Sequence, residues 1–439
     1  MHLLQRNHRP RRLRRAGHAL AALAPLAVAC GPGAWAQATA PAAEAPATPS
    51  GLMIGPIKLS AQFEAGFLIN PARPADGLNF GNLFTDHANQ AQLNQVLLTA
   101  SKPLDPKDSG YQWGFKFQVL YGSDARYTQF LGELNRVAPN ARYQLDIVEA
   151  HVLGHFPWIT EGGIDLKAGQ FSSPLGNETI DPSTNLFYSH SYTFQFGLPF
   201  KHTGALTITH VNSTLDLYAG VDTGANTTFG PLGDNNGAIG GIGGFALNLM
   251  DGNLTVLALT HFGPEQATRL LSPLGVNANG QWRFFNDVVV VWKASDKLTL
   301  TTELNWARDG YGAVGKTVNG FGVVQYASYA LTDTLALNAR GEVWRDDNNF
   351  LIASFPGNSS YIQVQQGFPV LIHAAPGTNT TYGALTLGAT WKPTLPAPVS
   401  GLLIRPEVRW DHAFTSNKPF NAQKDNNAVT FGADAVLTF

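Results

Sequence analysis

The sequence predicts an all-β fold, a closed antiparallel up-and-down transmembrane β-barrel of about 16 strands (range about 14–18). Three observations predict this fold. Segments whose side chains alternate between apolar and polar recur along most of the chain. Tight turns alternate with long connections between these segments. Pairs of aromatic residues also stand ten positions apart on the apolar face of single segments.

The N-terminal 36 residues have the layout of a secretory signal peptide, residues 1–36. Arginines precede an Ala/Leu-rich stretch, and a small-x-small cleavage site ends at Ala36. Cleavage before Cys30, which would give a lipoprotein, and export by a twin-arginine route are the alternatives. Residues 37–56 follow as a flexible Ala/Pro-rich leader. The remaining residues, 57–439, are expected to form the barrel.

The charge balance argues against a nucleic-acid-binding surface. The chain has 29 Lys and Arg against 31 Asp and Glu, and loss of the signal arginines leaves a net charge of about −8. The only cysteine, Cys30, lies in the signal, so the mature chain has neither disulfides nor thiolate metal ligands. After the predicted signal peptide, the longest apolar run lies near Val288–Trp292 and is too short for a membrane-spanning helix.

The alternating segments predict the strands one by one. In the first, apolar side chains from Ile57 to Phe67 share one face, and Lys58, Ser60, Gln62 and Glu64 share the other. The same pattern, or a weaker form of it, predicts sixteen strands near 57–67, 93–101, 111–121, 143–156, 164–171, 204–211, 214–222, 239–250, 254–262, 282–294, 297–308, 320–331, 334–345, 381–392, 402–412 and 429–439.

The connections alternate between two kinds. Several short ones carry turn signals, namely VNST, MDGN, KASDK and LTDT. The long ones are near 68–92, 122–142, 172–203, 223–238, 263–281, 346–380 and 413–428, with a shorter one at 309–319. A meander with this order places all long loops at one end.

The spacing of aromatic residues separates a membrane barrel from a soluble sandwich or propeller. Tyr111 and Tyr121 are ten residues apart, as are Trp282 and Trp292. Ten residues of a tilted strand rise roughly 25 Å, the height of the lipid-facing band between two aromatic girdles. The alternative is a buried sheet that carries aromatic side chains. The expected girdle residues are Tyr111, Tyr121, Trp282, Trp292, Trp306, Trp410 and Phe439.

The last segment, Val429–Phe439, alternates and ends on an aromatic residue. This ending resembles the C-terminal insertion signal of outer-membrane proteins. The expected partners are therefore outer-membrane lipid and the outer-membrane insertion machinery, which would bind the C-terminal strand.

Charged side chains fall opposite the apolar face, because a charge facing lipid costs ~2–4 kcal/mol near the bilayer midplane. Asn286 is an exception and is expected at a bulge, as is Pro406, which removes one donor from the strand ladder. A wet pore and an interior closed by its own salt bridges are the alternatives, and about sixteen strands favour the pore. The expected lumen-lining residues are Lys58, Glu64, Lys116, Asp216, Arg283, Asp287, Glu303, Arg340, Glu342, Arg405, Glu407, Arg409 and Asp411.

With these elements placed, the chain resembles the OmpL-like β-barrel porin family of Gram-negative bacteria over essentially its whole mature length. The residues that carry the resemblance are GQFSSPLGNETIDPSTNLFYSHSYTFQFGLPFKHTG, Gly169–Gly204, and RPEVRWD, Arg405–Asp411. The resemblance implies the barrel fold, a location in the outer membrane and a pore.

The long connection at 172–203 is a candidate constriction. In general porins the third long loop folds into the barrel, and by analogy this one would narrow the lumen with Glu178, Asp181 and Lys201. An external cap is the alternative.

Enzyme, cofactor and metal signals are weak. His151 and His155 would lie about 13 Å apart on a strand, too far for one zinc ion. HExxH and G-x-S-x-G motifs are absent from the sequence, and Gly241–Ala246 imitates a dinucleotide fingerprint without a following helix. No cofactor and no metal site are predicted.

The prediction is a non-enzymatic, porin-like channel for passive diffusion of small hydrophilic solutes. A monomer and a homotrimer are both compatible with the sequence. A closed structural or surface-interaction barrel is the main alternative, and an outer-membrane hydrolase is a third.

Overall fold

The computed structural model describes residues 51–130, 132–135, 137–138, 141–230, 236–311, 315–352, 379–396, 399–416 and 418–439. The predicted signal peptide and leader residues 37–50 lie outside the described residues, as does most of the predicted long loop at 346–380. In the described part of the chain, no helix is long and apolar enough to cross a membrane.

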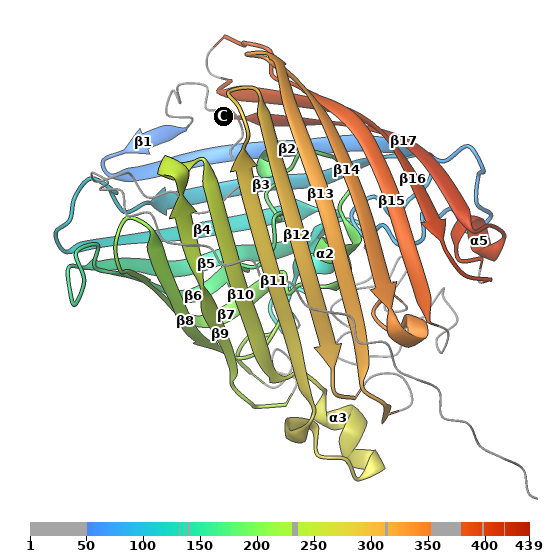
Figure 1. Cartoon of the computed structure of the whole chain (residues 1–439), viewed down its shortest axis with the longest axis horizontal. Coiled ribbons are helices and arrows are strands. Elements are labelled where there is room, and N and C mark those ends of the chain that lie inside the picture. Colours follow the sequence, from blue (N-terminus) through green and yellow to red (C-terminus); the bar gives the residue numbers. More distant parts are fainter. Residues whose placement is uncertain are drawn as a thin grey trace, which may run out of the picture. The chain divides into compact units, whose positions relative to one another are not determined.

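The described strands form one antiparallel sheet of seventeen, which closes on itself (Figure 1). Each strand from β2 to β17 pairs with its neighbours in sequence, and β17 pairs with β2 to close the ring. The strands are β1 (Leu52–Ile54), β2 (Ile57–Ile69), β3 (Gln90–Lys102), β4 (Gln112–Gly122), β5 (Gln144–Phe156), β6 (Ile164–Ser172), β7 (Lys201–His210), β8 (Leu215–Asp222), β9 (Gly240–Leu249), β10 (Leu254–Pro264), β11 (Trp282–Lys293), β12 (Leu298–Asp309), β13 (Val318–Thr332), β14 (Leu335–Asp346), β15 (Thr380–Trp391), β16 (Gly401–Ala413) and β17 (Asn427–Thr438).

The predicted fold class is confirmed, because β2–β17 make a closed barrel of sixteen antiparallel strands. Each of these strands overlaps one of the predicted segments. The additional strand, β1, pairs with β2 through Leu52↔Leu59 and Ile54↔Ile57. The prediction that the leader is flexible as far as residue 56 is therefore wrong for Leu52–Ile54.

The strands alternate between an outer face and an inner face, as a barrel in lipid requires. In β11 the side chains of Arg283, Phe285 and Asp287 are buried, whereas Trp282 at the start of the strand and Trp292 next to its last residue are exposed. The predicted girdle residues follow the same rule. Six have exposed side chains, namely Tyr111, Tyr121, Trp282, Trp292, Trp306 and Trp410. The seventh, Phe439, is half-buried and packs its ring 5.8 Å from that of exposed Phe63.

The two predicted bulges are wrong. Asn286 pairs in register with Thr260 on β10 and Trp306 on β12. Its side chain faces outward, and the Thr260 hydroxyl donates to its Oδ1 at 3.0 Å while its Nδ2 donates to the Trp306 carbonyl at 3.2 Å. These bonds satisfy the amide without a bulge.

Pro406 also lies in an unshifted register. On one side it pairs with Ala433 of β17. On the other side the β15–β16 ladder pairs Gly388 with Glu407 and Trp391 with Ile404, so the register is the same on both sides of Pro406. The missing N–H interrupts the pairing and inserts no extra residue.

The helices of the described residues are short and lie in the connections. They are α1 (Ala125–Thr128), α2 (Tyr192–Phe196), α3 (Thr268–Leu271) and α5 (Phe420–Gln423), with 3₁₀ turns η1 (Pro182–Thr184), η2 (Met250–Gly252), η3 (Ser272–Leu274), η4 (Ala278–Gly280) and η6 (Asp347–Asn349). Of these, α2 lies within the ring of strands (Figure 1).

An aromatic core forms inside the barrel, toward the end that carries the long loops. The ring of Phe84 lies 5.5 Å from Tyr127, 5.7 Å from Phe194 and 5.6 Å from Phe200. These residues come from three different connections between strands and are all buried. The long connections therefore pack on one another within the barrel.

Candidate functional site

The predicted lumen charges lie on the inner face of the barrel. Lys58 and Lys116 are half-buried, and the other predicted residues are buried. A buried charge is costly unless it is paired and hydrogen-bonded. The residues that pair with these charges therefore show which part of the chain occupies the barrel interior.

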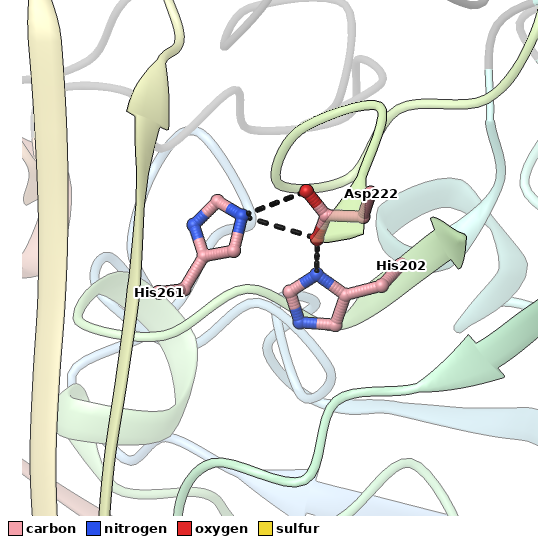
Figure 2. A group of neighbouring side chains, drawn as sticks. All are labelled: His202, Asp222 and His261. Atoms are coloured by element: carbon pink, nitrogen blue, oxygen red, sulfur yellow. Dashed lines mark hydrogen bonds and ion pairs between the residues drawn. The ribbon is translucent and has the colours of Figure 1, made fainter. Parts of the chain in front are cut away.

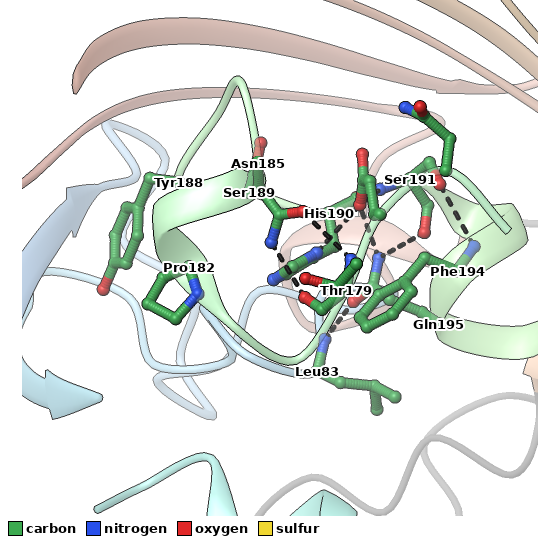
Figure 3. Close-up of polar contacts among 12 residues, drawn as sticks. Leu83, Thr179, Pro182, Asn185, Tyr188, Ser189, His190, Ser191, Phe194 and Gln195 are labelled. Carbon is green, nitrogen blue, oxygen red and sulfur yellow. Dashed lines mark hydrogen bonds and ion pairs between the residues drawn. The ribbon is translucent and has the colours of Figure 1, made fainter. Parts of the chain in front are cut away.

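Residues 173–200, which we call the inward segment, connect β6 to β7 and fold into the barrel. The segment contains η1 and α2, and each begins at a side-chain cap. Asp181 accepts a hydrogen bond from the Ser183 N–H at 2.9 Å, and the Ser191 hydroxyl accepts one from the Phe194 N–H at 3.1 Å. Figure 3 shows the cap that Ser191 provides to Phe194, together with Leu83, whose N–H donates to Gln195 at 2.5 Å.

Arg405 on β16 binds the first half of the inward segment to the barrel wall. Its Nη1 donates to the carbonyls of Pro182 and Asn185, both at 2.7 Å. Its other nitrogens pair with Asp434 on β17 and with Glu64 on β2, the latter at 3.3 Å. One guanidinium therefore pairs with two wall carboxylates and also satisfies two backbone acceptors.

The neighbouring charges of β16 bind the next part of the inward segment. Glu407 accepts hydrogen bonds from the backbone N–H groups of Tyr188 at 3.0 Å and Ser189 at 3.2 Å. Arg409 donates to the His190 carbonyl at 2.9 Å. Asp411 accepts from the Tyr192 hydroxyl at 2.8 Å. All four alternating charges of the RPEVRWD stretch thus contact the inward segment.

Arg340 on β14 is a further fully buried attachment. Its Nη1 donates to Glu178 Oε1 and to the Ser189 carbonyl, both at 2.7 Å. Burial by itself would raise the pKa of Glu178, but Arg340, the His190 ring at 2.8 Å and the Ser191 N–H hold it at about 2. Glu178 therefore stays ionised and paired at neutral pH.

The structure separates the three predicted constriction residues. Glu178 and Asp181 belong to the inward segment, and Asp181 also accepts from Gln62 of β2 at 2.9 Å. Lys201 does not lie in the loop as predicted, because it is the first residue of β7. Its ammonium is buried against Asp146 Oδ1 at 2.6 Å and the Ile147 carbonyl at 2.7 Å.

Glycines on the inner wall make room for the inward segment. A Cβ on Gly66 would lie 2.6 Å from Tyr188 Cζ and 2.8 Å from the Ala433 carbonyl. A Cβ on Gly388 would lie 2.6 Å from the Pro406 carbonyl and 3.3 Å from Phe187. Side chains at these positions would collide with the neighbouring strand and with the inward segment.

Gly66→Val is therefore expected to lower the free energy of unfolding by about 1–3 kcal/mol through overpacking. Gly341→Val is the matched control, because a Cβ there meets no atom within 4 Å. Urea unfolding followed by tryptophan fluorescence measures both. Equal losses in the two variants would contradict the close packing of Tyr188 on β2.

A polar cavity of about 220 Å³ lies beneath the inward segment, toward the short-turn end. Its lining includes Gln62, Thr99 and Gln118 from the wall and Asp181 and Ser183 from the segment. The inner wall of β4–β6 also keeps polar side chains that are only half-buried, namely Lys116 and Lys167. The wall charges of β14 and β16, by contrast, are covered by the segment.

The two histidines considered as zinc ligands bind different carboxylates. His151 Nδ1 lies 3.1 Å from Glu149, and His155 Nδ1 lies 2.6 Å from Asp165. A cluster that the sequence did not predict is formed by His202, Asp222 and His261, which come from β7, β8 and β10. The sequence signal for it was weak, because these residues are far apart in the chain and only their positions near strand ends connect them.

Several solved structures have folds similar to this chain. A Pseudomonas putida OprB structure determined at high pH matches with a TM-score of 0.51 at 12% identity, covering 87% of this chain and 94% of that one. An anion-selective porin from Comamonas acidovorans matches with a TM-score of 0.51 at 9% identity, covering 87% and 99%. The outer membrane channel DcaP of Acinetobacter baumannii matches at 0.49 and 13%, covering 89% and 100%. At these identities the likeness concerns the fold alone.

A comparison with curated proteins found no match to the chain. The model of one protein family, described as putative beta-barrel porin-2, OmpL-like, matches residues 56–439. This match includes all sixteen strands of the closed barrel, the inward segment and the charged stretch of β16. The chain therefore belongs to the OmpL-like β-barrel porin family.

Proposed function

We propose that the protein is an outer-membrane channel of a Gram-negative bacterium, through which small hydrophilic solutes diffuse passively past the inward segment. The observation that carries the proposal is the one-sided attachment of this segment. It is hydrogen-bonded to β2, β3, β12, β13, β14 and β16. On the other side of the barrel, Lys116 on β4 and Lys167 on β6 remain half-buried on the inner wall. The solute path runs between the segment and the β4–β8 wall, and no covalent step is involved.

The direct test is single-channel recording in planar bilayers with the purified full chain. Stepwise currents are expected at insertion. An inserted barrel that carries no current would contradict the channel and support the second candidate, a closed structural or surface-interaction barrel. The buried wall charges and the aromatic core around Phe84 are the observations that favour this second candidate. A homotrimer is part of the proposal, and the mass of the detergent-solubilised protein tests it.

Replacement of Lys116 and Lys167 by Gln is expected to shift selectivity toward cations. Each lysine places a positive charge beside the proposed path, and a unit charge about 8 Å from an ion in water contributes ~0.5 kcal/mol, or about twofold in relative permeability. The reversal potential in a KCl gradient measures the shift.

Lys293→Gln is the control for this experiment, because Lys293 is an exposed residue at the short-turn end of β11. Its replacement is expected to leave the reversal potential unchanged. Equal reversal potentials in the native chain and in the Lys116 and Lys167 variants would contradict a solute path beside these two lysines.

A further inference from the structure

Three side chains from separate strands converge on the inner face, near the ends of their strands (Figure 2). They are His202 on β7, Asp222 on β8 and His261 on β10. All three are buried, and both histidines have an exposed fraction of 0%. Two imidazoles and a carboxylate are therefore held away from bulk water.

The donor atoms of the three residues face a common point. His202 Nδ1 lies 2.6 Å from Asp222 Oδ2, and His261 Nε2 lies 3.1 Å from the same oxygen. One ligand atom of each residue lies within 4.8 Å of the other two. Tetrahedral zinc with bonds of ~2.0–2.1 Å requires ligand atoms about 3.3 Å apart. Small side-chain shifts would therefore convert the present arrangement into three metal ligands.

A glycine, Gly240, lies in the wall beside the cluster. A Cβ on Gly240 would collide with Asp222 Oδ1 and would lie 2.9 Å from His261 Nε2. Because glycine occupies this position, the carboxylate and the imidazole can approach each other from neighbouring strands. The space that they share would otherwise be filled by a side chain.

Polar groups outside the cluster bind two of its members. His202 Nε2 lies 3.0 Å from the Ser173 hydroxyl. The carboxylate of Glu265 lies 4.0 Å from His261 Nδ1, which is too far for a hydrogen bond. The Gly224 N–H donates to Asp222 Oδ1 at 3.0 Å. In metal sites the second ring nitrogen of a histidine ligand usually contacts a carboxylate, a carbonyl or another polar group, which fixes the tautomer and the ring orientation.

We propose that His202, Asp222 and His261 bind one first-row transition metal ion of the Zn²⁺ class. Two imidazole nitrogens and one carboxylate suit borderline cations of this class and disfavour Ca²⁺ and Mg²⁺, which prefer sets of oxygen ligands. The ion joins β7, β8 and β10. Through Ser173, it also fixes the first residue of the inward segment.

The test is zinc binding by the metal-stripped, full-length barrel in detergent, titrated with ZnCl₂ against a chromophoric chelator. One zinc ion per chain is expected, together with a rise in the melting temperature when zinc is added. His202→Gln and His261→Gln are each expected to lower the zinc affinity by at least about tenfold. Binding of Ca²⁺ instead of Zn²⁺ would overturn the proposal.

His210→Gln is the matched control. His210 also lies on β7, is buried and pairs with a carboxylate, Asp216, at 2.8 Å, but it is outside the cluster. This variant is expected to bind one zinc ion with native affinity. Loss of zinc in His210→Gln alone, or native affinity in both cluster histidine variants, would overturn the proposal.

Folding of each variant is verified by the heat-dependent shift in gel mobility that closed barrels show. If a histidine variant does not fold, Asp222→Asn keeps the side-chain shape and removes the charged ligand. Zinc is then expected to raise the melting temperature of the native chain and of His210→Gln, and not that of Asp222→Asn. A native chain that binds no zinc would show that the three residues form only a hydrogen-bonded cluster.

Discussion

A chain in which residues 174–199 are replaced by Asn-Gly is expected to conduct several times more current per channel than the native chain. The Ser173 N–H donates to the Phe200 carbonyl at 2.9 Å, so the strand pairing already extends one step beyond Ser172↔Lys201. A two-residue turn can therefore close this hairpin without moving the strands. Removal of the inward segment leaves the inner wall of the barrel facing water. Single-channel recording in planar bilayers measures the conductance.

The control for this deletion shortens a different loop. Residues 268–280 connect β10 to β11, contain α3, η3 and η4, and include exposed Leu274. Their replacement by a short Gly/Ser linker is expected to change the conductance far less. An unchanged conductance after removal of 174–199 would show that the inward segment does not narrow the path. Current only after its removal would instead identify the native chain as a closed barrel.

The strands could be predicted because lipid imposes a strict alternation on every one of them. β11 shows this best, since its aromatic ends and its inner charges obey a period of two over the whole strand. The alternation fails where an inner residue is covered by another part of the chain. β7, for example, begins at Lys201 and not at the predicted residue 204. The sequence pattern missed these first residues because Lys201 and His202 are buried polar residues with partners on other elements.

The contacts of the inward segment could not be predicted, because each joins residues far apart in the chain. The spacing of Arg405, Glu407, Arg409 and Asp411 shows that they share a face, but not what covers that face. The structure covers it with backbone groups of residues 182–190 and the Tyr192 hydroxyl. The predicted meander likewise places β7 beside β8, but it does not show that His202, Asp222 and His261 meet.

Arg340→Met is expected to lower the free energy of unfolding by about 3–5 kcal/mol, because it leaves a buried carboxylate without its cation. The guanidinium donates to Glu178, to the Ser189 carbonyl and, at 3.2 Å, to the Thr386 hydroxyl, and its exposed fraction is 0%. Methionine fills a similar volume but satisfies none of these acceptors. Urea unfolding followed by tryptophan fluorescence measures the loss. Arg345→Met is the control, because Arg345 lies on the same strand and its side chain is 38% exposed.

The variant Glu178→Gln shows whether the lower free energy of unfolding of Arg340→Met comes from the Arg340–Glu178 ion pair. The pKa of Glu178 is lowered to about 2 in the folded chain. Relative to an unfolded value of about 4.3, this lowering corresponds to about 3 kcal/mol of stabilisation. Because the folded-state pKa is the lower one, this stabilisation is fully present above about pH 4.3. It is lost as the pH falls from there through about 2. The stability difference between the native chain and Glu178→Gln should therefore be largest at neutral pH and shrink across that interval.

The double variant Arg340→Met/Glu178→Gln should lose less stability than the two single losses combined, since no unpaired charge remains in the interior. Strict additivity would mean that the two side chains act independently, despite the 2.7 Å between Arg340 Nη1 and Glu178 Oε1. A stability difference that does not change between neutral pH and about pH 2 would show that the charge of Glu178 does not hold the inward segment to β14.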